Sequence, residues 1–423
     1  MPHRALSGGK NALMPQHAAP RRRRPPRQVR LALSISVLVA VVGAIALIFS
    51  GGGSHDDKNQ GSAATKATNP TTTTTTSPFR HVPPGPPADQ RTLSLIKTIG
   101  GPISPKSVTA SDTGLVLAQN MMYRHSITVY DSAGNLVKTI PDSVDLSTVG
   151  IPGGATVQGA PVEAAFTPDA KYAYASNYSM YGPGQGPEGS DSCTPSSAKA
   201  AGDTPSYVYR IDAKSLAVDQ AIQVGLVPKY VATTPDGRYV LVTNWCSWDL
   251  NVIDIVQAKV VTTLPMGSYP RGIAVTPDSK WAYVANMGGT TVTKVNLSSL
   301  SVAGSFAVGQ SPRHLVMDPA GRFLYATLNA PGEVIKIDLS NDQVAARVHT
   351  GQEARSLAVS TDGTALYVVN YESNTVTKLR ASDLSALQTV STGVNPIGIT
   401  YDATTGNVWV AIYTGQILIF KDS

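Results

Sequence analysis

The sequence predicts an all-β fold, a seven-bladed β-propeller, over residues 92–423. A segment of the type 231–244 recurs seven times, and the last four intervals between copies are each 42 residues long. Apolar runs of strand length alternate with turn signals about every ten residues, which leaves no room for a helix of ordinary length. An all-β repeat of about 40–45 residues is typical of propeller blades.

The repeat is clearest in three copies, 231–244, 273–286 and 357–370. The weaker copies end at Asn120, Asn177, Leu328 and Ile412. Each copy contains a strand, a Thr-Pro-Asp or related turn, and a second strand that usually ends at asparagine. Proline presets φ and aspartate caps its own backbone, so this tripeptide suits the centre of a β-turn. We expect the asparagines to form turns as well, because Asn tolerates a left-handed φ.

Each unit contains four candidate strands, for example 302–308, 272–275, 281–285 and 291–295. The chain stops after a strand of the fourth type, 416–420, and the propeller begins with one of the first type, 94–99. If this opening strand completes the last blade, the ring closes and only short, protected sheet edges remain. The sequence therefore predicts a closed ring.

The positive charge of the chain is concentrated in its first thirty residues. Residues 1–30 contain eight Arg or Lys and no acid, so a net charge of +6 leaves −2 for the rest. This gives no support for a nucleic-acid-binding body. Residues 31–50 carry no charge, and twenty helical residues cover about 30 Å, the thickness of a bilayer core. The positive-inside rule then predicts a cytoplasmic tail at 1–30 and an exported propeller.

The alternative for residues 31–50 is a cleaved signal peptide. Signal sequences have apolar regions of about 7–15 residues and end in a small-x-small site. This run is longer, and 47–50 is a poor site, so we expect an uncleaved anchor in the cell membrane. Residues 51–91 are rich in Gly, Thr and Pro and are expected to form a disordered linker. A Thr/Pro tract is also typical of an O-glycosylated stalk.

A cationic residue follows the turn between the first and second strands in five of the seven units. These residues are Lys106, Lys229, Arg271, Arg313 and Arg355. In a propeller the turns of this type share one face with the turns between the third and fourth strands, usually the binding face. A ring of cations at a channel mouth would concentrate the electric field on an anion. The alternative is five solvated loop charges that extend over the strands below.

An aromatic residue follows the asparagine position in four units. These residues are Tyr178, Trp245, Tyr371 and Tyr413. In equivalent turns of one face they would form a stacking surface for a ligand. The alternative is packing between neighbouring blades.

The second unit carries both large insertions, residues 141–160 and 178–207, and both fall on this same face. The only cysteines are Cys193, in the second insertion, and Cys246, in the equivalent turn of the next unit. Two cysteines are too few for a disulfide framework, and their spacing does not fit a zinc site. We expect them to form one disulfide, which would persist outside the membrane.

Catalytic signatures are weak in this sequence. It contains no Gly-rich phosphate loop, no His-Glu-x-x-His and no nucleophile elbow. Glu163 and His314 occupy one position in units two and five, and together they are weak candidates for acid–base catalysis. These two units are, however, separated in the ring. The acidic residues of the insertions lack EF-hand spacing, so we predict no metal and no cofactor.

The runs 283–286, 367–370 and 241–244, with Thr-Pro-Asp or Ser-Thr-Asp ahead of them, resemble the YVTN-type β-propeller repeat family. The resemblance covers residues 92–423 and implies a seven-bladed fold that is common among bacterial envelope and surface proteins. It implies no single activity, because such relatives include binding propellers, structural propellers and lactonase-like enzymes.

The resulting expectation is a membrane-anchored binding or scaffold module of the cell envelope. Its partner would be a protein, a peptide or an anionic glycan on the loop face. A lactonase-like hydrolase in the same central funnel is the second interpretation. Binding of single-stranded nucleic acid to the aromatic and cationic face is the third, and the −2 charge of residues 31–423 argues against it.

Overall fold

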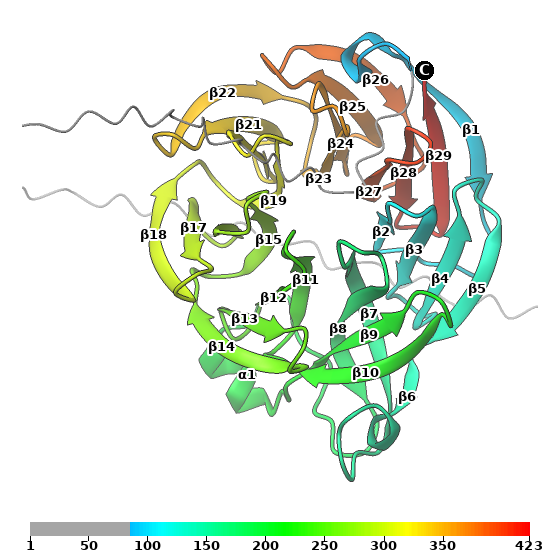
Figure 1. Cartoon of the computed structure of the whole chain (residues 1–423), viewed down its shortest axis with the longest axis vertical. Helices are drawn as coiled ribbons and strands as arrows, with labels where there is room; N and C mark the ends of the chain where they lie inside the picture. Colours follow the sequence, from blue (N-terminus) through cyan, green and yellow to red (C-terminus); the bar gives the residue numbers. More distant parts are fainter. Residues whose placement is uncertain (1–84) are drawn as a thin grey trace, which may run out of the picture. The chain divides into compact units, whose positions relative to one another are not determined.

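The computed structural model describes residues 85–423, and in this part of the chain seven antiparallel sheets are arranged radially as the blades of a propeller (Figure 1). Seven inner strands contact one another in a closed cycle around the axis. The predicted all-β, seven-bladed propeller is thereby confirmed.

The blades are numbered along the chain and their strands are given from the axis outward. Blade 1 contains β2 (Ser107–Ala110), β3 (Leu115–Asn120), β4 (Ser126–Asp131) and β5 (Leu136–Pro141). Blade 2 contains β7 (Thr156–Phe166), β8 (Tyr172–Tyr181), β9 (Tyr207–Asp212) and β10 (Ala217–Gln223), with β6 (Ser143–Asp145) on the free side of β7. Blade 3 contains β11 (Pro228–Thr233), β12 (Tyr239–Asn244), β13 (Asp249–Asp254) and β14 (Lys259–Pro265).

Blades 4 to 6 repeat this plan. Blade 4 contains β15 (Pro270–Val275), β16 (Trp281–Asn286), β17 (Thr291–Asn296) and β18 (Ser301–Ala307). Blade 5 contains β19 (Pro312–Met317), β20 (Phe323–Leu328), β21 (Glu333–Asp338) and β22 (Gln343–His349). Blade 6 contains β23 (Ala354–Val359), β24 (Ala365–Asn370), β25 (Thr375–Arg380) and β26 (Ala386–Ser391).

Blade 7 closes the ring with strands from both ends of the described chain. It contains β27 (Pro396–Asp402), β28 (Asn407–Ile412), β29 (Gln416–Asp422) and β1 (Leu93–Ile99). The register of β1 against β29 runs from Leu93 opposite Asp422 to Ile99 opposite Ile417. The predicted pairing of the opening and closing strands is confirmed.

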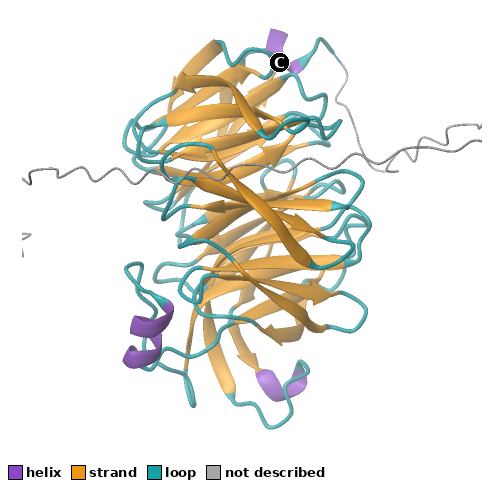
Figure 2. Ribbon diagram, turned by 90° about the vertical axis from the view of Figure 1, so that its left-hand side faces the viewer, coloured by secondary structure: helices purple, strands orange, loops and turns teal. Residues whose placement is uncertain are grey.

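Helices contribute little to the described residues. They are the 3₁₀ turns η1 (Ala88–Gln90) and η2 (Leu146–Thr148) and the short helix α1 (Pro195–Ala201), which lies outside the sheets (Figure 2). Between residues 85 and 423, no helix combines the length and apolar character needed to cross a membrane. The predicted tail, the predicted anchor at 31–50 and most of the predicted linker lie outside the described residues.

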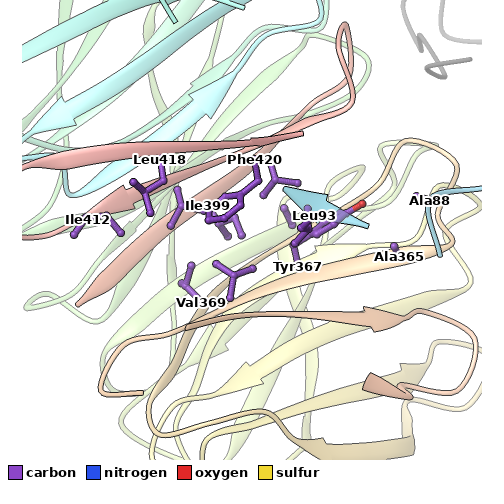
Figure 3. Packing of buried hydrophobic residues seen from close by; sticks show 13 residues of the cluster. Ala88, Leu93, Ala365, Tyr367, Val369, Ile399, Ile412, Leu418 and Phe420 are labelled. Carbon is purple, nitrogen blue, oxygen red and sulfur yellow. The ribbon is translucent and has the colours of Figure 1, made fainter. Parts of the chain in front are cut away.

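Residues 85–91, expected to belong to a disordered linker, instead dock on blades 6 and 7. The backbone N–H of Ala88 donates to Asp362 Oδ2 at 2.8 Å, and that of Asp89 donates to Thr364 Oγ1 at 3.1 Å. Ala88 is fully buried in the hydrophobic cluster between these blades, together with Leu93 and Phe420 (Figure 3). The segment is ordered because its backbone donors find side-chain acceptors on the neighbouring blade.

The asparagines at the ends of the second strands do not form left-handed turns. Asn120, Asn177, Asn244, Asn286 and Asn370 are buried, and none has a positive φ. In blade 4, Nδ2 of Asn286 donates to the Thr291 and Thr293 hydroxyls at 3.0 and 2.9 Å, and its Oδ1 accepts from the Gly267 N–H at 3.1 Å. The asparagine therefore ties the third strand to the incoming loop, and a buried amide is retained because its hydrogen bonds are made.

Candidate functional site

The inner strands begin with a shift in strand pairing, and this shift determines which side chains point toward the propeller axis. The pairing register shifts at the start of β11, β15, β19 and β23, and equivalent shifts occur in β7 and β27. A β-bulge redirects the side chains beside it, so two consecutive residues can both face the channel. The first of these two positions holds Lys229, Arg271, Arg313 and Arg355, and the second holds Glu163 and His314. The fifth predicted cation, Lys106, precedes β2, which pairs with β3 without such a shift.

The five predicted cations converge at the axis. Lys229, Arg271 and Arg313 are 4–5% exposed, whereas Lys106 and Arg355 are half-buried. The pKa of Lys106 lies well below its ordinary value, first because of burial and then because of repulsion from the other four cations. The alternative of solvated loop charges is therefore wrong for the three buried members. We call these five residues the cation ring.

Carboxylates compensate the cation ring only in part. Asp191 accepts from Lys229 Nζ at 2.6 Å, Glu353 accepts from Arg355 Nη2 at 2.7 Å, and Glu163 lies 3.8 Å from Arg271 Nη2. Among the described residues, Lys106 and Arg313 form no ion pair. Arg313 is 4% exposed and makes one long side-chain hydrogen bond, from Nη1 to Ser356 Oγ at 3.4 Å. Burial, and then the neighbouring Arg271 and Arg355, lower the pKa of Arg313 well below its ordinary value.

The four predicted aromatic residues lie against the cation ring. Lys229 Nζ is 4.2 Å from the ring centre of Tyr178 and 5.1 Å from that of Trp245. The Arg355 guanidinium lies 3.3 Å from the ring centre of Tyr371, and Lys106 Nζ lies 5.2 Å from that of Tyr413. Tyr178 and Trp245 are also buried in a hydrophobic cluster. These aromatic residues therefore pack in the protein interior and also contact cations, and their faces stabilise the positive charges of the cation ring.

The second insertion covers part of the cation ring. The disulfide predicted between Cys193 and Cys246 is present, with Cα atoms 5.4 Å apart. Trp245 Nε1 donates to the Asp191 carbonyl at 3.1 Å, and the Tyr178 hydroxyl donates to the Gly189 carbonyl at 2.8 Å. These contacts hold the Asp191 carboxylate on Lys229. Burial acts to raise the pKa of Asp191, but Lys229 reverses this and leaves that pKa below its ordinary value.

A central cavity of about 430 Å³ begins at the second of these two positions, which we call the second axial position and which holds Glu163 and His314. It is lined there by Ser107, Glu163, Tyr230, His314 and Ser356. Glu163 and His314 thus share one cavity although their blades are separated in the ring. The Tyr230 hydroxyl lies 2.6 Å from His314 Nε2. Burial, opposed by Arg271, raises the pKa of Glu163.

The geometry of His314 does not suit a general base. Its Nδ1 accepts from the Leu357 N–H at 2.9 Å, and its Nε2 is occupied by Tyr230. Burial, followed by Arg313 and Arg271, lowers the pKa of His314 to about 3. At neutral pH the ring is uncharged and both of its nitrogens are engaged. In residues 85–423, no group of three or more His, Cys, Asp and Glu side chains is arranged to hold a metal ion.

Sequence reasoning missed the roles of Tyr230 and Asp191. Tyr230 occupies the same repeat position as Glu163 and His314, so the repeat itself placed it beside the cavity. Asp191 lies in an insertion that has no counterpart in the other blades, and no repeat position could reveal its contact with Lys229.

Residues 202–388 match the family described as YNCE-like beta-propeller. No curated protein matches the chain. Among solved structures, Kuenenia stuttgartiensis hydrazine synthase is similar, with a TM-score of 0.60 and 17% identity over 76% of this chain and 97% of that chain. A likeness at this identity shows the fold alone. The family match and the seven-bladed ring fit a YVTN-type propeller family, as the sequence repeat predicted.

Proposed function

We propose that the propeller is a binding module whose cation ring takes up the anionic group of a small ligand. One observation carries the proposal: Arg313 is a buried guanidinium without a carboxylate partner, in a group in which cations outnumber contacting carboxylates. A buried charge is costly unless it is paired and hydrogen-bonded. A bound anion would supply the missing partner.

The burial of the ring favours a small ligand over a broad macromolecular surface. Lys229, Arg271 and Arg313 expose too little area for a flat partner to contact. A single carboxylate, sulfate or phosphate group is narrow enough to reach them, and guanidinium groups match the geometry of such anions. An envelope protein, peptide or glycan would then bind through one acidic group inserted at the axis.

The test is equilibrium dialysis of the protein against radiolabelled sulfate, which stays a dianion across the working pH range. We expect saturable binding of one sulfate and at least tenfold weaker binding in Arg313→Met, because a hydrogen bond to a charged group contributes about 1.5–3 kcal/mol. Arg322→Met is the matched control, since Arg322 lies in the same blade with its side chain 74% exposed. Absence of saturable binding to the wild type, or equal binding by Arg313→Met, would refute the proposal.

We also propose that residues 31–50 anchor the chain and place the propeller outside the cytoplasm. The uncharged run, the preceding basic tail and the disulfide between Cys193 and Cys246 support this, because disulfides persist in oxidising compartments. In intact cells, added protease should degrade the propeller, and alkaline carbonate should leave the chain with the membranes. Protection from the protease before lysis would contradict the proposed topology.

A further inference from the structure

We propose that the cavity below the cation ring is the chamber that holds the body of the ligand, and that the ligand enters from the face opposite the insertions. This inference rests on the proposed function, since it assigns a route and a ligand class to the same axial site. The ligand class is a small organic anion with hydrogen-bond donors along an otherwise neutral body.

The shape of the channel supports this route. Beneath the second axial position the cavity continues along the inner strands to the turns that follow them. Its lining at that end includes Ser111, Asp112, Thr167, Pro168 and Thr400. Asp112 is exposed, so this end reaches the surface of the propeller. A volume of about 430 Å³ lies within the range of small-molecule sites.

The other end of the channel is partly closed by the second insertion. Asp191 lies on Lys229, and its backbone carbonyl is held by the Trp245 indole. The disulfide from Cys193 fixes the next residues of the same loop to blade 3. Asp191 therefore already occupies Lys229 from this face, and an anion arriving here would have to compete with its carboxylate for that cation.

A hydrogen-bond relay orients one donor toward the chamber. The Leu357 N–H donates to His314 Nδ1, so the proton of the neutral imidazole is on Nε2. That proton points to the Tyr230 oxygen at 2.6 Å, and the Tyr230 hydroxyl keeps its own proton free to donate. No hydrogen bond donated by this hydroxyl is formed within the described residues. Tyr230 is thus a positioned donor for the anionic group, next to the ring.

The walls of the chamber offer acceptors rather than donors. The Ser107 hydroxyl donates its proton to one of two acceptors within the protein, the Gln119 side-chain oxygen or the Val162 carbonyl at 2.8 Å, and Ser356 donates to the Ile397 carbonyl at 2.8 Å. Thr109 and Thr233 donate in the same way to carbonyls of β7, at 2.9 and 2.7 Å. Each hydroxyl has a single proton, so what it presents to a ligand is a lone pair. A ligand body with hydroxyl, amide or ammonium donors matches these walls.

The route is tested with Ser356→Cys in the full chain, because Ser356 lines the chamber beside Arg313. Two thiol reagents are compared, the anionic 2-sulfonatoethyl methanethiosulfonate and the cationic 2-(trimethylammonio)ethyl methanethiosulfonate. Each rate is divided by the rate of the same reagent with 2-mercaptoethanol. We expect the anionic reagent to be favoured at least tenfold, since the thiol lies beneath the cation ring.

Two further variants, each combined with Ser356→Cys, locate the entrance. Thr400→Trp narrows the lower end and should slow both reagents at least tenfold. Asp191→Ala removes the side chain at the upper end. Because it also leaves Lys229 without its carboxylate, which favours the anionic reagent by either route, the cationic reagent is the one compared, and its rate should rise less than threefold. A large acceleration by Asp191→Ala together with no effect of Thr400→Trp would overturn the route while leaving the anion preference intact.

The remaining outcomes are also decisive. Loss of the anion preference would refute the proposed function, whatever the route. Failure of the introduced thiol to react with either reagent would show that the chamber is closed and would overturn the proposed route. If Thr400→Trp does not fold, a large acceleration of the cationic reagent by Asp191→Ala overturns the route, and the absence of acceleration supports it. Circular dichroism and mass spectrometry of the intact disulfide identify misfolded variants.

Sulfate dialysis also tests whether the Tyr230 hydroxyl donates a hydrogen bond to the bound anion. We expect Tyr230→Phe to weaken sulfate binding roughly three- to tenfold, because it removes only the oriented hydroxyl. Tyr325→Phe is the matched control, since its buried hydroxyl donates to the Ala381 carbonyl at 2.9 Å, away from the chamber. Equal effects of the two variants would reject a specific contact of Tyr230 with the anion.

Discussion

Two buried clusters of charge in this propeller differ in how their cations are paired. One cluster lies at the closure, the place where β1 pairs with β29 to complete the propeller. There Lys378 is fully buried, and its Nζ donates to Asp422 Oδ1 at 2.5 Å and to the Arg91 carbonyl at 2.8 Å. The other oxygen of Asp422 accepts from the Tyr367 hydroxyl at 2.6 Å. One cation thus meets one carboxylate, and their main hydrogen bonds are made within the protein. At the cation ring, by contrast, Arg313 has no such partner.

This difference separates a structural ion pair from the cation ring that we propose as a binding site. Both locations bury positive charge, so burial alone does not distinguish them. The closure is complete without any other molecule, whereas the cation ring retains an excess of positive charge that an external anion can neutralise. The same kind of substitution, a cation replaced by methionine, is therefore expected to destabilise the protein at the closure but not at the cation ring.

The largest expected effect is at the closure. Lys378→Met should lower the free energy of unfolding by about 3–5 kcal/mol, because it leaves the Asp422 carboxylate buried without its cation. Urea unfolding followed by tryptophan fluorescence measures this loss. The double variant Lys378→Met/Asp422→Leu should recover most of it, and a double variant as unstable as the single one would contradict the explanation.

The disulfide is expected to give the next largest effect. Replacing Cys193 and Cys246 together by serine should lower the free energy of unfolding by about 2–4 kcal/mol, since the bond closes a span of 53 residues. The midpoint of thermal unfolding provides the measurement. Sulfate binding should persist in this variant, because the insertion lies on the side away from the proposed entrance. Its loss would make the insertion part of the binding site.

Arg313→Met is the counterpart of Lys378→Met at the cation ring. It should leave the free energy of unfolding unchanged or raise it by on the order of 1 kcal/mol, because it removes a buried cation that lacks a carboxylate. The same urea titration tests it in the absence of sulfate. A destabilisation of the size expected for Lys378→Met would mean that Arg313 is a structural residue.

The smallest expected effect is a dependence of anion binding on pH. Burial, opposed by Asp191, lowers the pKa of Lys229 to about 8. Lys229 is therefore charged below this pH and loses its charge as the pH rises through about 8, so sulfate affinity should fall there by roughly tenfold or less. Dialysis at pH 6.5, 7.5, 8.5 and 9.5 follows the change. Lys229→Met should abolish the step near pH 8 while leaving the weaker binding in place.

Much of the fold was predictable because each blade repeats the same local pattern. The Thr-Pro-Asp turn is an example: Thr276 Oγ1 donates to Asp278 Oδ1 at 2.6 Å and accepts from the Trp281 N–H at 3.0 Å. All of these partners lie within six residues, so the sequence contains the whole interaction. The five cations and four aromatic residues of the site were identified for the same reason, since they occupy repeat positions.

The asparagines and the docking segment were not predicted correctly because their partners are distant or depend on burial. Asn286 looked like a turn residue, but the incoming loop of its blade supplies the Gly267 N–H, and the amide is buried. The Ala88 N–H finds its acceptor 274 residues away, on Asp362. A local pattern gives no information about such a partner.

The sequence by itself determined seven radial sheets, the closing strand pair and the identity of the residues that face the axis, because strand periodicity and turn chemistry are local properties that recur in every blade. The tertiary structure alone decided that three cations are buried, that Asp191 covers Lys229, and that Tyr230 and His314 meet across the channel. These features depend on which side chains from different blades share one small volume, and there burial and pairing set the energy of each charge.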